Sequence, residues 1–445
     1  MDDRELIEIL TPFNFWRTTP FMGIIRPRYI NELKRLSSTG QVIVVTGVRR
    51  SGKTTTLIQF MHHLIDNGTI TPLQALYVNF EDPRLPIENG TALPDQIISA
   101  HRSFVDPDGL HYLILDEVQR LPQWERWVRI QMEMHPNLHI IVSGSSAELL
   151  SKELGTLLTG RHIDMEVFPL DLSEYLSFHD IDPKDPLADA DRIQSLTSEY
   201  ISSSAFPAVV LTTEPDLKER MVFQIYRDII NHDVARRYEV REIEKLESVA
   251  TTFMASVPGP VTLNGTRRAL GGRVSLDSIE RYSRYLEEPY LLFFIETHSF
   301  SAGKRERSPR KVYAIDNGLL LAVSHRFSSD RGKLLENLVF LDIRRAGLEV
   351  YRLMDKKEVD FLIWNATAPL ALVNVCLDVS DAKTRKREVD GLRRAMGEFH
   401  MEYGYIVTLD HAELMDIEEG VIEFVPYRRW AMEGAGAFFS ASHLF

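Results

Sequence analysis

The 445-residue sequence has a single cysteine, Cys376, and no long apolar segment. One thiol excludes an intrachain disulfide and is typical of a reducing compartment. Its apolar runs are far shorter than the roughly 20 residues that span a bilayer. A signal peptide begins with basic residues followed by an apolar stretch, whereas the first residues of this chain are acidic. These absences predict a cytoplasmic protein with no membrane partner.

Positive charge is also scarce, because 51 Lys and Arg residues stand against 64 Asp and Glu residues, a net charge of −13. A nucleic-acid-binding surface would therefore have to be a local patch. Hydrophobic residues make up 44% and charged residues 26% of the chain, the balance of an ordinary globular protein, which excludes a disordered chain. The length is typical of about three domains.

The order of apolar patterns indicates where these domains lie. Up to about residue 170, apolar strands alternate with helices, which predicts an α/β fold with a parallel sheet covered by helices on both faces. After Pro215 the pattern changes to helices and a basic hairpin, typical of a winged helix-turn-helix domain. From Lys333 a helix, several strands and a second helix predict a small α/β domain. We expect domains at 1–211, 212–325 and 326–430, and a tail at 431–445.

A phosphate loop is the strongest motif, because GVRRSGKT follows a predicted strand at 42–45 and precedes a predicted helix at 54–67. Two glycines allow the tight turn that points backbone N–H groups at phosphate oxygens, and the helix adds its positive dipole end. Lys53 should reach the β- and γ-phosphates, and Thr54 should bind Mg²⁺. The expected nucleotide contacts are Gly47, Val48, Arg49, Arg50, Ser51, Gly52, Lys53, Thr54 and Thr55.

A pair of acids follows a second apolar strand, Tyr112–Leu115. Ligands of open α/β sheets bind at the carboxyl ends of the strands, where Asp116 and Glu117 are expected. We expect Asp116 to hold Mg²⁺, directly or through water, and Glu117 to polarise the attacking water.

Two further residues are candidates for sensing or neutralising the γ-phosphate. Ser145 follows the strand expected at 139–143, and a hydroxyl there senses the phosphate if this strand lies between the two motif strands. Ser143 is the alternative. Arg161 follows the next predicted helix and is interpreted as an arginine finger, acting in cis or on a neighbour's nucleotide, or as a plain surface residue.

Nine segments match one family over nearly the whole chain: GVRRSGKT (47–54), LILDEVQ (113–119), VSGSSAELL (142–150), LLTGR (157–161), FPAVV (206–210), YRDIINHD (226–233), RYSRYLEEPYLL (281–292), KVYAIDNGL (311–319) and EVDFLIW (358–364). The sequence thereby resembles prokaryotic AAA-superfamily P-loop ATPases, common in archaea, that carry a C-terminal domain of unknown function. It departs from them at Ser204-Ala205, where the family usually has Gly-Gly. The resemblance implies ATP binding and hydrolysis, a winged-helix middle and a C-terminal fold related to PD-(D/E)xK nucleases.

Basic residues gather in the middle of this acidic chain, on the expected recognition helix and on the hairpin that follows it. Such clustering suits contacts with the phosphates of duplex DNA, and the alternative is a lid or a protein contact with solvated charges. The candidate DNA-binding residues are Arg281, Arg284, Lys304, Arg305, Arg307 and Arg310.

Glu336 on a helix and Asp360 on a strand resemble the carboxylates with which PD-(D/E)xK nucleases bind Mg²⁺. The third element should read acid-x-Lys, but strand alternation brings Asn374 and Cys376 to that face. Among nearby residues, Asp378, Lys383 and Lys386 are the available substitutes. We therefore expect a degenerate nuclease site, with an active nuclease as the alternative.

These patterns predict an ATPase with ATP and Mg²⁺ as cofactors, in which hydrolysis resets a conformational switch coupled to DNA, a protein partner or a homo-oligomer. The alternatives are a slow nucleotide-gated switch without DNA and an ATP-gated nuclease. A small-molecule kinase is less favoured, because it gives the acid pair and the two extra domains no role.

Overall fold

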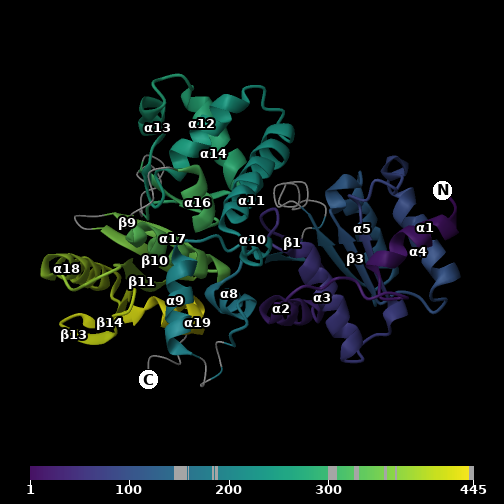
Figure 1. Cartoon of the computed structure of the whole chain (residues 1–445), viewed down its shortest axis with the longest axis horizontal. Coiled ribbons are helices and arrows are strands. Elements are labelled where there is room, and N and C mark those ends of the chain that lie inside the picture. Colours follow the sequence, from purple (N-terminus) through teal and green to yellow (C-terminus); the bar gives the residue numbers. More distant parts are fainter. Residues whose placement is uncertain are drawn as a thin grey trace. The chain divides into compact units, whose positions relative to one another are not determined.

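The computed structural model describes residues 1–144, 158, 160–182, 185, 189–298, 308–324, 330–354, 358–365 and 368–439. Its contacts divide the chain into unit 1, Met1–Val167, and unit 2, Phe168–Phe445 (Figure 1). No helix of the described residues is long and apolar enough to cross a membrane.

Unit 1 is built on a five-stranded sheet in the order β2-β3-β4-β1-β5, in which every neighbouring pair is parallel. Nearly every strand residue is buried except in β5, as expected when helices cover both faces. β4 lies between the strands that precede the two motifs. The strands are β1 (Val42–Thr46), β2 (Ala75–Asn79), β3 (Tyr112–Asp116), β4 (His139–Ser143) and β5 (His162–Glu166).

Helices cover both faces of this sheet. One core contains side chains of α1, α4 and α5, and the other contains side chains of α2 and α3. The predicted parallel α/β sheet is therefore confirmed, whereas the helix predicted at 147–158 lies almost entirely outside the described residues. The helices are α1 (Asp3–Leu10), α2 (Pro27–Ser37), α3 (Lys53–Asp66), α4 (Ala92–Phe104) and α5 (Trp124–Met134).

Unit 2 begins with a segment that the sequence analysis included in the first domain. Leu170 is fixed within unit 2, because its N–H donates to the Ala205 carbonyl at 2.8 Å and its carbonyl accepts the Tyr200 hydroxyl at 2.9 Å. Arg345 also donates to the carbonyls of Pro169 and Leu170, at 3.3 and 3.2 Å. The helices of this segment are α8 (Leu172–Phe178), α9 (Ala190–Ile201) and α10 (Pro207–Val210).

The middle of unit 2 contains helices and a three-stranded antiparallel sheet in the order β6-β8-β7. The predicted hairpin strands are present as β7 and β8, and β6 is an additional strand. α11 continues into a π-helical segment, Ile229–Arg236. The elements are α11 (Pro215–Asp228), α12 (Ile243–Met254), β6 (Gly259–Val261), α13 (Leu263–Ala269), α14 (Leu276–Glu287), β7 (Leu292–Ile295), β8 (Arg310–Ala314) and α16 (Asn317–Val323).

A six-stranded mixed sheet, β13-β14-β12-β11-β10-β9, forms the rest of unit 2. β9, β10 and β11 are antiparallel, whereas β11, β12 and β14 run parallel. α18 packs on one face, and Phe340 of α17 stacks on Phe361 of the other. The elements are α17 (Arg331–Arg345), β9 (Glu349–Met354), β10 (Glu358–Asn365), β11 (Ala368–Val375), α18 (Ala382–Phe399), β12 (Tyr403–Thr408), β13 (Glu413–Ile417), β14 (Gly420–Pro426), α19 (Tyr427–Glu433) and α20 (Ala435–Phe438).

Candidate nucleotide site

The phosphate loop joins the buried end of β1 to the start of α3. Gly47 has φ 144°, and a Cβ there would lie 2.2 Å from the carbonyl oxygen of Val167, so only glycine fits. Gly52, with φ 100°, is the N-cap of α3 and makes no side-chain cap. No side chain at the N-cap therefore accepts a hydrogen bond from the first N–H groups of α3. A phosphate-binding helix requires this, because these N–H groups must donate to the phosphate.

Lys53 is folded back over this loop. Its side-chain ammonium donates to the carbonyls of Gly47 and Val48, at 2.9 and 3.3 Å, and the residue is 8% exposed. Val48 and Ser51 are buried, whereas Arg50 and Thr54 are exposed. The loop therefore holds a cation at its centre, where the charge of a bound phosphate would be neutralised.

Asp116 gathers three hydroxyl groups at the carboxyl end of β3. Thr54 and Tyr77 each donate to Asp116 Oδ2 at 2.6 Å, and Ser143 donates to Asp116 Oδ1. Asp116 is fully buried. Hydroxyl and carboxylate oxygens are the ligands that Mg²⁺ takes from proteins, so Thr54 and Asp116 fit the predicted metal position.

Glu117 follows in a left-handed conformation, φ 53° and ψ 40°, which is uncommon for a residue with a Cβ. This conformation ends the strand and gives Glu117 a different direction from Asp116. Gln119 donates to Glu117 Oε2 at 2.6 Å. Burial, and secondarily the charge of Asp116, raise the pKa of Glu117, whereas Lys53 acts to lower it. A carboxylate with a raised pKa is suited to accept a proton from water.

The two remaining predicted residues do not join this cluster in the described structure. Ser145 lies outside the described residues, and the alternative, Ser143, contacts Asp116. Arg161 pairs with Glu133 at 2.6 Å, and its carbonyl accepts the N–H of Val42, at the first residue of β1. The phosphate loop follows the other end of that strand, about 15 Å away at 3.3 Å per residue. These contacts lend no support to a role in cis, and both the role in cis and the role in trans stay predictions.

Sequence reasoning missed the residues that brace the phosphate loop from the N-terminal side. Arg26, which is 3% exposed, donates to the Ser51 carbonyl at 2.8 Å. Gln59 of α3 binds the carbonyls of Met22 and Ile24 and the N–H of Arg26. Only the buried partners distinguish these two residues from ordinary surface Arg and Gln, so no sequence signal marks them.

We expect Arg26→Met to weaken ATP binding by about tenfold, because a buried, charged hydrogen bond contributes roughly 1.5–3 kcal/mol. Isothermal titration with a non-hydrolysable ATP analogue measures this change. Arg28→Met is the matched control, because Arg28 is an exposed arginine in the first turn of α2, two residues after Arg26. Equal affinities of the two variants for the ATP analogue would show that Arg26 does not brace the phosphate loop.

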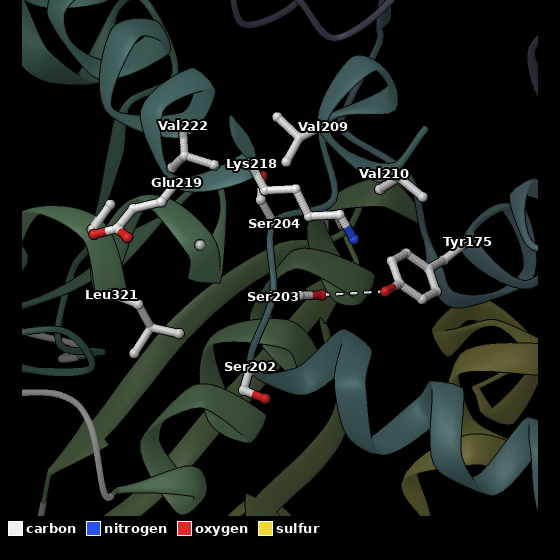
Figure 2. A pocket seen from close by; sticks show the side chains of 12 residues that line it. Tyr175, Ser202, Ser203, Ser204, Val209, Val210, Lys218, Glu219, Val222 and Leu321 are labelled. Carbon is white, nitrogen blue, oxygen red and sulfur yellow. Dashed lines mark hydrogen bonds between the residues drawn. The ribbon is translucent and has the colours of Figure 1, made fainter. Parts of the chain in front are cut away.

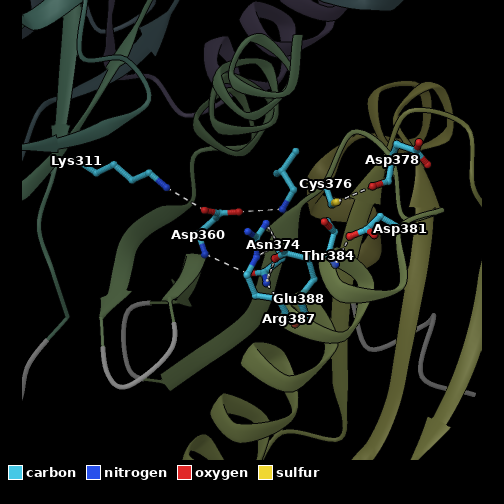
Figure 3. Close-up of polar contacts among 10 residues, drawn as sticks. Lys311, Asp360, Asn374, Cys376, Asp378, Asp381, Thr384, Arg387 and Glu388 are labelled. Atoms are coloured by element: carbon cyan, nitrogen blue, oxygen red, sulfur yellow. Dashed lines mark hydrogen bonds and ion pairs between the residues drawn. The ribbon is translucent and has the colours of Figure 1, made fainter. Parts of the chain in front are cut away.

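The predicted nuclease-like residues Glu336 and Asp360 do come together in unit 2, but with a lysine between them. Figure 3 shows this lysine, Lys311, beside Asp360. Lys311 of β8 lies 2.7 Å from Glu336 Oε1 and 2.9 Å from Asp360 Oδ1, and Tyr313 also donates to Glu336. Burial, followed by the charge of Asp360, raises the pKa of Glu336 to about 8. The acid-x-Lys pattern predicts a lysine near β11, whereas the structure supplies one from β8.

Asn374 and Cys376 contribute differently to this region (Figure 3). The Asn374 side chain accepts the Asp360 N–H at 3.1 Å and donates to Glu388 at 2.8 Å, so it organises the backbone of β10. Cys376 instead belongs to the core between the sheet and α18. The suggested substitutes Asp378, Lys383 and Lys386 are exposed. Within the described residues no group of acids, His and Cys is arranged to hold a metal ion.

We expect Cys376 to be an inert thiol, because burial raises its pKa to about 11. It is the sole cysteine, so a colorimetric thiol reagent at pH 8 reports on it alone. The native protein should react at least tenfold more slowly than the urea-unfolded chain. Equal rates in both states would contradict this.

The candidate DNA-binding residues divide into three groups. Arg281 and Arg284 are exposed on α14, although Asp277, Glu280 and Glu288 are exposed nearby. Arg310 is half-buried, donates to Ser283 and lies over the Phe294 ring. The residues outside the described part of the chain are Lys304, Arg305 and Arg307.

The geometry of unit 1 defines a P-loop ATPase domain, with the phosphate loop after β1 and the acid pair at the carboxyl end of β3. A family model described as an AAA domain matches residues 39–176, so this domain is of the AAA type. A second family model, for a domain of unknown function (DUF8612), matches residues 194–330 in the middle of the chain.

The chain belongs to the same family as an uncharacterized protein of Haemophilus influenzae, which is 30% identical over 344 residues, 76% of this chain and 83% of the relative. An uncharacterized protein of Methanocaldococcus jannaschii is 28% identical over 88% of each chain. Among solved structures, a Walker-type ATPase of Pyrococcus abyssi has a TM-score of 0.44 at 12% identity and covers 70% of this chain and 99% of its own. AMPPCP-bound DnaA of Aquifex aeolicus has a TM-score of 0.32 at 17% identity and covers 62% and 93%.

Proposed function

We propose that this protein is a Mg²⁺-dependent ATPase whose nucleotide state controls DNA binding by unit 2. The observation that carries the proposal is the meeting of Lys53, Thr54, Asp116 and Glu117 at one edge of the parallel sheet. These are the four groups that phosphoryl transfer to water needs: a cation for the phosphates, two metal ligands and a base.

Each residue has a separate task in this proposal. Backbone N–H groups of the loop and of α3 bind the phosphates, and Lys53 balances their charge. Thr54 and Asp116 hold Mg²⁺, which neutralises the phosphate oxygens when it is bound. Glu117 orients a water molecule for attack on the γ-phosphate and accepts its proton, while Gln119 holds the Glu117 carboxylate in place.

The middle of unit 2 supports duplex DNA as the partner. We infer that the elements in the order α12-β6-α13-α14-β7-β8 form a winged helix with α14 as its recognition helix. Exposed arginines before and on α14 give local positive charge in an acidic chain: Arg267, Arg268, Arg273, Arg281 and Arg284.

A nuclease activity is not part of this proposal. Lys311 occupies the space between Glu336 and Asp360 that a catalytic metal would need, and its ammonium already balances their charge. We infer that the six-stranded domain serves binding or assembly.

ATP hydrolysis by the purified protein, measured with and without duplex DNA, tests the proposal. We expect turnover that increases with DNA and is abolished by Lys53→Ala. Arg281→Ala with Arg284→Ala should weaken DNA binding and reduce its salt dependence, whereas Arg220→Ala, an exposed arginine on α11, should leave both unchanged. Slow turnover that DNA does not change would favour a nucleotide-gated switch with a protein partner.

A further inference from the structure

A pocket of about 240 Å³ lies within unit 2, where the segment 202–204 meets α10, α11 and α16 (Figure 2). Its volume is below the roughly 300–1,000 Å³ of sites for drug-sized ligands, so an occupant must be small. None of the residues assigned above to nucleotide or DNA binding lines it. The pocket therefore requires a separate explanation.

One side of this pocket is apolar. Val209 and Val210 of α10, Val222 of α11 and Leu321 of α16 contribute aliphatic side chains. The three valines are at most 6% exposed, so their positions are fixed by packing. A short hydrocarbon group bound here would remove the remaining apolar surface of these side chains from water, which favours binding.

The other side carries hydrogen-bond donors and a positive charge. Figure 2 shows the Lys218 ammonium directed toward the side of Tyr175 and Ser203, whose hydroxyls are 3.5 Å apart. Burial raises the pKa of Tyr175, and the nearby Glu199 carboxylate acts in the same direction, so the phenol keeps its proton and can donate it in a hydrogen bond. Among the described residues, no carboxylate forms an ion pair with Lys218, and the carboxylate of Glu219 lies on the opposite side, beside Leu321.

The floor of the pocket is rigid. Asp316 accepts the N–H groups of Ala205 and Leu319, at 2.7 and 2.9 Å, and so ties the 202–206 segment to α16. A Cβ on Gly318 would lie 2.4 Å from the Cβ of Ser204, so glycine permits this close approach. A site that is formed before its ligand arrives loses little affinity to ordering.

We propose that this pocket binds a small aliphatic monocarboxylate. Its carboxylate would pair with Lys218 and accept hydrogen bonds from Tyr175 and Ser203, and its hydrocarbon chain would contact the valines and Leu321. Glu219 at the far side disfavours a dicarboxylate through like-charge repulsion. This site is independent of the proposed ATPase activity, because no residue is shared.

Isothermal titration of the full-length protein without nucleotide tests this proposal with isocaproate, a branched monocarboxylate, as the probe. The neutral isocaproamide and the dicarboxylate glutarate have similar size and different charge. We expect isocaproate to bind at least tenfold more tightly than either. Lys218→Met should remove the preference for isocaproate over the amide. Arg220→Met, on the same helix and exposed, should keep it.

Steric filling provides a second test that does not depend on charge. Val222→Phe should abolish isocaproate binding, and thermal unfolding of the variant shows whether it remains folded. Ser203→Ala, at a half-exposed position, is the milder variant and should weaken binding. Equal binding of acid and amide, unchanged affinity in Lys218→Met, or no isocaproate binding at millimolar concentration would each overturn the proposal.

Discussion

Replacing Glu117 by Gln should lower kcat for ATP hydrolysis by about 10²–10⁴-fold, the usual contribution of a general base. The affinity for ATP should change little, because the amide has nearly the same shape and the phosphates are held by the loop and Lys53. Single-turnover hydrolysis measures the rate, and titration with a fluorescent ATP analogue measures the affinity. Glu81→Gln is the matched control, because Glu81 is an exposed acid whose charge also acts on Glu117.

The same residue predicts a pH dependence. Glu117 must be ionised to accept a proton, and its pKa lies above the ordinary value because the side chain is buried beside Asp116. Turnover should therefore fall as the pH decreases, and the fall should begin at a higher pH than for an ordinary glutamate. Two results would contradict the role of Glu117 as the general base. One is wild-type turnover in Glu117→Gln, and the other is a pH–rate profile whose acid limb lies at the ordinary Glu pKa.

The nucleotide site shows which features local sequence determines. The strand Val42–Val45, the phosphate loop and the strand ending at Asp116 were predicted to within about a residue, because their signals are contiguous. The hydroxyls of Tyr77 and Ser143 were not assigned to Asp116, because those contacts depend on strand order and register. Ser143 was an alternative only if its strand lay between the motif strands, and it does.

Unit 2 was less predictable for three physical reasons. Gly259–Val261 is a three-residue strand that contains proline, and proline argues against a strand in a sequence pattern. In the sequence Lys311 is part of a basic hairpin, whereas in the structure it is buried. Sequence alone does not distinguish a buried cation from a solvated one. The segment after Val167 continues the first domain in sequence, and only its hydrogen bonds to Tyr200, Ala205 and Arg345 place it in unit 2.

The buried lysine gives the largest expected effect on stability. Lys311→Met should reduce the free energy of unfolding of unit 2 by about 3–5 kcal/mol, because it leaves two largely buried acidic side chains without their cation. Unfolding in urea followed by hydrogen exchange resolves the peptides of unit 2 from those of unit 1. Lys333→Met is the matched control and should stay within about 0.5 kcal/mol, because Lys333 is half-exposed and pairs with Asp330 on the surface.

The pH dependence of this loss follows from Glu336. Its pKa in the folded protein is about 8, above the ordinary 4.5, so ionisation of Glu336 costs stability as the pH rises between these values. Near pH 5 the protonated Glu336 needs no cation, and the deficit of Lys311→Met should be small. In the variant the pKa of Glu336 should rise further, because Lys311 no longer lowers it, so the deficit should grow as the pH rises above about 8. Lys311→Met combined with Asp360→Asn should recover part of it, because one charge is then absent. A deficit that does not vary with pH would mean that Lys311 acts through packing of its aliphatic chain, and the ionic interpretation of the Glu336–Lys311–Asp360 triad would fail.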